Sequence, residues 1–227
     1  MDGMDNLRRV LWQANQSDIQ TGLVSWWKYK QLTREIAWKY DFPPHIGAAV
    51  FSALSPNNDY HGNLRDTDTL LCGVRLGKIP ADISVSTYDN NKIKAWQIAH
   101  YCTDDPLDRL VFPKTRNFYL NIKDPSDPLP VTVDGHVYNA WRNQRISLKG
   151  AAMRFKPAQY DEIAEAIRQI GAEYRMIPNQ VQGVIWHTWR RLHGIKHTNQ
   201  LELWDCGAIS ARLGYQNFTG AACSTAL

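Results

Sequence analysis

The sequence is poor in cysteine and has no long apolar run. Its four cysteines stand far apart, at positions 72, 102, 206 and 223, without a C-x-x-C pair. Neither a disulfide framework nor a zinc or iron–sulfur site is therefore indicated. The longest apolar run, residues 46–51, is far below the roughly 18 residues that span a bilayer, and the N-terminal residues lack the apolar core of a secretory signal. We expect a cytoplasmic protein with reduced cysteines and with no metal, cofactor or membrane partner.

An excess of charge of one sign is also missing. The formal net charge is +4 and the isoelectric point is near 8.8, which is compatible with a nucleic-acid partner but does not require one. Hydrophobic residues, by contrast, make up 44% of the chain and include nine tryptophans. This composition supports a sizeable core, and tryptophan rings outside that core can stack on bases or sugars.

The spacing of apolar residues predicts an all-α protein of about ten helices. Only weak strand signals occur, at 82–87 and 129–133, and the second is better interpreted as the lead-in to a helix. We expect one monomeric domain over 1–227, with a motif-bearing core at about 45–145 and a helical C-terminal part at 146–227. The expected helices cover residues 5–13, 23–40, 45–54, 63–73, 91–101, 114–122, 134–144, 157–170, 178–192 and 202–213.

Two motifs in the middle of the chain carry the chemistry. The first is K-T-R-N-F-Y-L-N, which begins at Lys114, and the second is V-T-V-D-G-H-V, in which Asp134 stands at an expected helix start. Together they resemble the K-T-A-N-x-x-L-N helix and the V-D-x-H-V signature of the helix-hairpin-helix (HhH-GPD) DNA glycosylase superfamily. The resemblance implies that Asp134 is the catalytic carboxylate and that Lys114 matches the nucleophile of the bifunctional members, which also have AP-lyase activity.

A third motif, L-S-P-N at residues 54–57, matches the family's L-S-x-Q, whose last side chain enters the gap left by a flipped nucleotide. The resemblance therefore implies DNA contacts for Ser55, Asn57 and Asn58. The glycines of the family's hairpin are absent before Lys114, and Asn139 replaces an arginine. The segment 177–190 is similar to phage-associated and thymine-hypermodification relatives, so the resemblance is to a divergent branch without an iron–sulfur cluster.

This resemblance implies a DNA N-glycosylase that flips out and excises a modified base, such as a hypermodified phage pyrimidine, and leaves an abasic site. Its setting would be phage–host conflict, antiviral defence or DNA repair. A carboxylate beneath the sugar stabilises the positive charge that develops as the N-glycosidic bond breaks, and flipping costs a few kcal/mol. The expected DNA- or base-binding residues, beyond those of the L-S-P-N motif, are Arg116, His136, Gln182 and Trp186.

Other interpretations remain open. Asp134 can be only a helix cap, Lys114 only a surface or phosphate-contacting cation, Asn57 only a turn residue, and His136 a structural histidine. Gln182 and Trp186, with Arg190 on the same helix face, either border the site or flank the core. Two alternative functions follow: a phage DNA base-hypermodification enzyme that displaces pyrophosphate from a hydroxymethyl pyrimidine, and a non-catalytic helical DNA-binding protein.

Overall fold

The chain folds into an all-helical protein. The computed structural model describes residues 2–101, 105–148 and 156–195. These residues form nine α-helices and two 3₁₀ helices and contain no strand. The all-α prediction is therefore confirmed. The helix expected at 202–213 and three of the cysteines lie outside the described residues, while Cys72 is a free thiol on α4.

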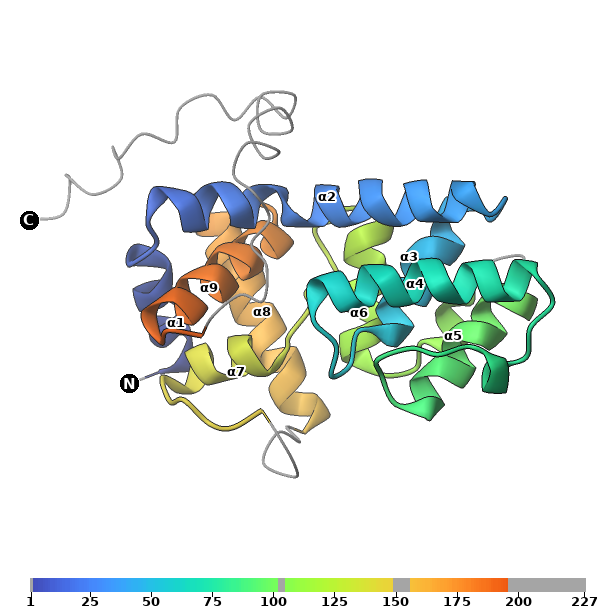
Figure 1. Cartoon of the computed structure of the whole chain (residues 1–227). Helices are drawn as coiled ribbons and strands as arrows, with labels where there is room; N and C mark the ends of the chain where they lie inside the picture. Colours follow the sequence, from blue (N-terminus) through green and yellow to red (C-terminus); the bar gives the residue numbers. More distant parts are fainter. Residues whose placement is uncertain (1, 102–104, 149–155, 196–227) are drawn as a thin grey trace, which may run out of the picture.

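Two hydrophobic cores lie side by side along one long helix (Figure 1). The first core is built from consecutive elements, and its centre is a cluster of aromatic rings. Trp26 and Phe118 meet edge to face at 5.3 Å between ring centroids, while Phe51 stacks on Phe118 at 5.8 Å. The helices of this core are α3 (Pro44–Leu54), α4 (Tyr60–Arg75), α5 (Asp89–Tyr101) and α6 (Pro113–Lys123), with the C-terminal half of α2 (Gln16–Lys39).

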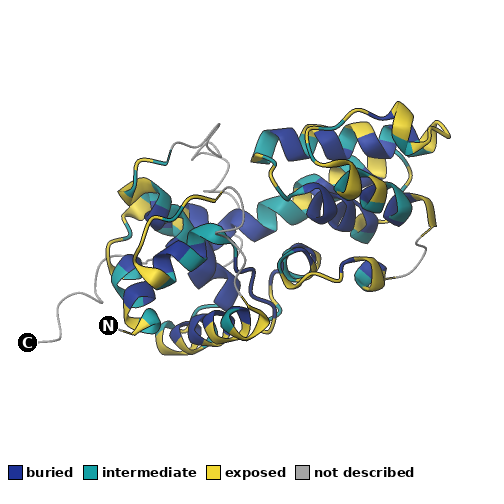
Figure 2. Ribbon diagram, turned by 90° about the horizontal axis from the view of Figure 1, so that it is seen from below, coloured by how far each residue is buried: buried dark blue, intermediate teal, exposed yellow. Residues whose placement is uncertain are grey.

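The second core joins the beginning of the chain to its later part. It is formed by α1 (Gly3–Trp12), α7 (Gly135–Arg142), α8 (Pro157–Tyr174) and α9 (Pro178–Leu192). Seen from below, the two groups of helices are distinct, with buried residues at the centre of each (Figure 2). Helix α7, which follows Asp134, packs with α1 and α9 in this second core.

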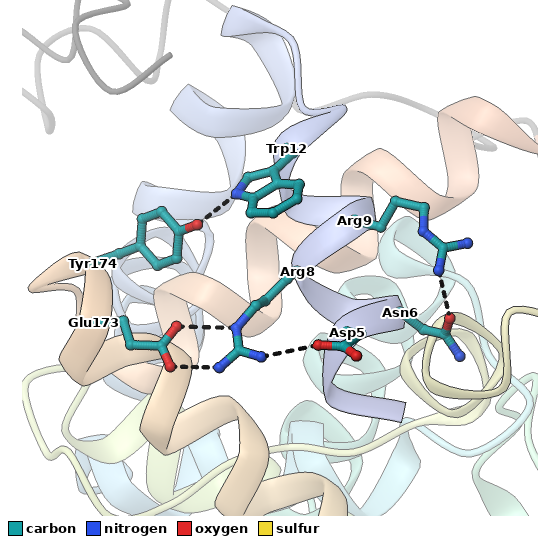
Figure 3. Close-up of polar contacts among 7 residues, drawn as sticks. All are labelled: Asp5, Asn6, Arg8, Arg9, Trp12, Glu173 and Tyr174. Atoms are coloured by element: carbon teal, nitrogen blue, oxygen red, sulfur yellow. Dashed lines mark hydrogen bonds and ion pairs between the residues drawn. The ribbon is translucent and has the colours of Figure 1, made fainter. Parts of the chain in front are cut away.

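Polar contacts between distant parts of the chain attach α1 to the second core. Arg8 lies between Asp5 and Glu173 (Figure 3) and donates to both carboxylate oxygens of Glu173, at 3.1 and 2.6 Å. Trp12 donates from its indole nitrogen to the hydroxyl of Tyr174 on α8. Bidentate arginine–carboxylate pairs fix geometry as well as adding energy, so these contacts hold α1 in one orientation against α8.

The bridging helix α2 begins with a capping box, in which Asn15 accepts from the Asp18 backbone N–H and Asp18 accepts from that of Asn15. Its 24 residues span about 36 Å. Against α9 the two backbones touch: a Cβ placed on Gly22 would lie 2.4 Å from the backbone nitrogen of Val184, and one on Gly183 would lie 2.6 Å from the carbonyl oxygen of Gly22. Only glycine permits this approach.

The boundaries of the elements agree with the sequence best where proline marks the first turn. Both α8 and α9 begin at the expected prolines. By contrast, α2 begins at Gln16, well before the expected residue 23, and α4 begins at Tyr60 rather than at 63. Residues 82–87, which have only a weak strand signal, begin at the last residue of the 3₁₀ helix η1 (Pro80–Asp82) and pair with no strand among the described residues. Residues 129–133 lead into α7, as expected.

Candidate functional site

Asp134 forms the N-cap of α7, and its carboxylate is fixed by the backbone. The Oδ1 atom accepts hydrogen bonds from the backbone N–H groups of His136 and Val137 at 2.9 and 3.0 Å. Aspartate is favoured here because its side chain accepts from the free N–H groups of the first turn, and because the helix dipole favours negative charge at this end. The sequence-based placement of Asp134 at a helix start is confirmed.

A side chain from α9 holds the other oxygen of this carboxylate. The indole nitrogen of Trp186 donates to Oδ2 of Asp134 at 2.8 Å. The described residues therefore supply three hydrogen bonds to a group that offers about four lone-pair positions, and the remaining acceptor position is on Oδ2. Asp134 and Trp186 are both only partly buried.

Tyr160, on α8, fixes the two motifs relative to each other. Its hydroxyl donates to the Val131 carbonyl at 2.8 Å and accepts from the Val133 N–H at 3.1 Å and from the Asn117 side chain at 2.9 Å. Asn117 belongs to the first turns of α6, close to Lys114, while Val133 directly precedes Asp134. One buried phenol oxygen therefore links the helix that carries Lys114 to the segment that carries Asp134.

A second asparagine of the K-T-R-N-F-Y-L-N motif supports the same segment. The Asn121 side chain donates to the Pro130 carbonyl at 2.8 Å and accepts from the Thr132 hydroxyl at 2.8 Å. Asn121 is fully buried, and a buried amide without partners is costly. Asn117 and Asn121 thus act structurally, by fixing the backbone that leads to Asp134.

Charged and aromatic groups from both cores surround the carboxylate. Arg190, one turn beyond Trp186 on α9, places its guanidinium 4.3 Å from the centre of the Trp186 ring and interacts electrostatically with Asp134. Burial raises the pKa of Tyr29, on α2, to about 12; Arg190 opposes this rise and Asp134 adds to it. Burial lowers the pKa of His136, Asp134 opposes this, and Arg190 and Lys114 lower it further. His136 is therefore neutral at pH 7.

The predicted site residues thus divide into two groups. The structure brings Asp134, His136 and Trp186 together, with Lys114 within electrostatic range of His136. Gln182 lies on the same α9 face as Trp186 but is buried, and its Oε1 has no hydrogen-bond partner among the described residues.

The other predicted residues serve local structure or face solvent. Ser55 donates to the Ser52 carbonyl at the end of α3, and Asn58 donates to Asp66 at 2.7 Å. Asn57 is exposed in the left-handed conformation, with φ of 59°, which is typical of a turn asparagine. Arg116 is exposed on α6. None of these four has a recorded contact with Asp134 in the described part of the chain.

Tyr29, Tyr160, Asn117 and Arg190 complete the site. The sequence indicated Arg190 only as a residue on the same helix face as Gln182 and Trp186, and it did not indicate Tyr29 or Tyr160. Asn117 had a signal, because it is part of the motif that begins at Lys114. In the described ranges, no group of three or more His, Cys, Asp or Glu side chains is placed to hold a metal ion. No helix there is both long and apolar enough to cross a membrane.

The fold and site define an all-helical protein in which two cores meet at one carboxylate-centred polar cluster. The chain belongs to a family described as "Family of unknown function (DUF7178)", which matches residues 2–193. The match runs from before α1 to just after the last residue of α9 and therefore includes both cores. No curated protein and no solved structure matches the chain.

Proposed function

We propose that this chain is a DNA N-glycosylase, a divergent relative of the HhH-GPD superfamily that excises a modified base and leaves an abasic site. The observation that carries the proposal is the carboxylate of Asp134, which three hydrogen bonds fix in a partly buried position. Asp134 belongs to the motif that resembles the V-D-x-H-V signature of the glycosylases. The motif that begins at Lys114 is linked to this segment through Tyr160.

In this reaction Asp134 stabilises the positive charge that develops on the deoxyribose as the N-glycosidic bond breaks. A charge that is already held in place needs no reorganisation at the transition state, which makes such stabilisation effective. Lys114 and Arg190 supply positive charge near the carboxylate, which suits a polyanionic substrate. Water, or the Lys114 amine in a lyase reaction, attacks the sugar carbon.

The test uses a matched pair of aspartate variants. Asp134→Asn removes the charge but keeps a favoured N-cap residue, whereas Asp161→Asn changes an exposed carboxylate in the second turn of α8. Both proteins are incubated with DNA from several hypermodified phages and with oligonucleotides that carry modified pyrimidines. Mass spectrometry measures the released bases, and alkaline cleavage reveals abasic sites.

We expect base release by the wild-type chain and by Asp161→Asn, and a loss of roughly a hundredfold or more in Asp134→Asn. Full activity of Asp134→Asn would refute the proposed role of this carboxylate. Borohydride trapping of a protein–DNA adduct that is lost in Lys114→Ala would assign lyase chemistry. Release of pyrophosphate without a free base would replace the proposal by base hypermodification, and salt-dependent binding without any product would replace it by a non-catalytic DNA-binding role.

A further inference from the structure

The turn that leads into α6 exposes two large apolar side chains. This turn, residues 110–113, follows the 3₁₀ helix η2 (Pro106–Arg109). Leu110 is fully buried in the first core, but Val111 and Phe112 are 64% and 63% exposed. Contiguous exposed apolar residues on a folded protein commonly mark a binding surface. We call residues 110–113 the α6 entry turn.

The backbone of this turn is fixed even though its side chains are exposed. The carbonyl of Phe112 accepts from the backbone N–H of Arg116 at 2.9 Å and from the Thr115 hydroxyl at 3.1 Å. Proline at Pro106 and Pro113 restricts the chain on both sides. The backbone that carries Phe112 is therefore restrained, which lowers the backbone entropy lost when the exposed side chain binds a partner.

Positive charge surrounds the exposed ring. The ammonium of Lys94, on α5, lies 5.0 Å from the centre of the Phe112 ring, and Arg109 and Arg116 are exposed before and after the turn. Lys114 follows Phe112 by two residues. Two described carboxylates, Asp105 and Asp108, precede the turn, and Asp105 is paired with Lys123 on α6. The four cations therefore leave an excess of positive charge, which favours a polyanion as the partner.

We propose that the α6 entry turn binds an unpaired base of nucleic acid, with Phe112 stacking on the base and the surrounding cations facing the phosphates. Aromatic rings within positively charged surfaces are the usual means of binding unstacked bases without sequence preference. The inference rests on the proposed function, because both require DNA as the partner.

The experiment measures the binding of the full chain to two DNA probes at fixed salt concentration. One probe is a fully paired duplex, and the other is the same duplex with one unpaired fluorescent adenine analogue. The variants are Phe112→Ala, Phe112→Trp and, as a matched exposed apolar control at the end of α4, Leu76→Ala, since Leu76 is 68% exposed. Urea unfolding of each variant checks that the fold is retained.

We expect Phe112→Ala to bind the unpaired probe about tenfold more weakly than the wild-type chain and the paired duplex about equally. Phe112→Trp should retain tight binding and quench the fluorescent base, and Leu76→Ala should match the wild-type chain on both probes. Equal binding of Phe112→Ala and wild-type protein to the unpaired probe, or equal weakening on both probes, would overturn the inference.

The two proposals fail in different ways. If Phe112→Ala binds normally while base release still depends on Asp134, only the base-stacking role of the turn is refuted. If the wild-type chain binds neither probe at any salt concentration, DNA is not the partner, and the proposed function is refuted together with the inference.

Discussion

Replacing Tyr160 with phenylalanine removes one oxygen and leaves the packing of the ring unchanged, so it isolates the hydrogen bonds that link α6 to the segment before Asp134. The lost oxygen leaves the Val133 N–H and the Val131 carbonyl without this partner. Both valines are fully buried, so water cannot replace the bonds without opening the structure. The half-buried Asn117 side chain can turn toward solvent.

Each buried polar group left without a partner costs ~1–3 kcal/mol. With two such groups, we expect Tyr160→Phe to lower the free energy of unfolding by about 2–6 kcal/mol. Urea unfolding followed by tryptophan fluorescence measures this difference, and an unchanged dependence on urea concentration shows that the folded state stays compact. The control is Tyr101→Phe, at a tyrosine that is 60% exposed.

The control should unfold within about 0.5 kcal/mol of the wild-type protein. If Tyr160→Phe also falls within that margin, the hydroxyl does not hold the Val131–Val133 segment. Tyr160 would then not be the residue that fixes the two motifs relative to each other.

Three further predictions concern stability. Gly22→Ala should destabilise the fold by about 1–3 kcal/mol, because the new Cβ would lie 2.4 Å from the Val184 backbone nitrogen; an unchanged or raised urea midpoint would contradict this close approach. Asn15→Ala should cost about 1 kcal/mol through loss of the capping box, with reduced helicity by circular dichroism after mild heating. The pKa of His136 is lowered in the folded protein, mainly by burial, so the unfolded chain binds more protons as the pH falls. The contribution of a neutral His136 to stability should therefore be complete above the unfolded pKa of about 6.5 and decrease as the pH falls below it. The difference between the urea midpoints at pH 7.5 and 5.5 should be smaller in His136→Asn than in the wild-type protein. Part of the pH dependence should remain, because burial also lowers the pKa of His193. If the two midpoints differ as much in His136→Asn as in the wild-type protein, His136 does not cause the pH dependence of stability.

Local signals were sufficient for most helices and for the placement of Asp134. Proline at the first helical position marked the starts of α8 and α9, and the V-D-G-H pattern placed Asp134 at an N-cap. The start of α2 was missed because its first turns bury polar residues and glycine against α9, including Asp18 and Gly22, so apolar periodicity fades there. The capping-box pair of Asn15 and Asp18 was the signal that could have found it.

The remainder of the site depends on how distant helices pack. No local pattern indicates that the Trp186 indole reaches Asp134 across 52 positions, or that Tyr160 joins Asn117 to Val133. Which tryptophans are buried and which are exposed also could not be predicted from the sequence. Trp26 and Trp189 are buried, Trp12 and Trp38 are mainly exposed at 71% and 56%, and Trp186 holds the candidate carboxylate.

The attachment of α1 to α8 has a consequence for the order in which the protein assembles on the ribosome. The first core comes from one continuous stretch of chain, whereas Arg8 must wait for Glu173, 165 positions later. At synthesis rates of about 5–20 residues per second, that delay is roughly 8–33 s for 165 residues. Until α7 has been made, the apolar face of α1, with Leu7 and Val10, has no native partner from the second core. The nascent chain therefore carries an exposed amphipathic helix that chaperones can bind until α7, α8 and α9 have been made.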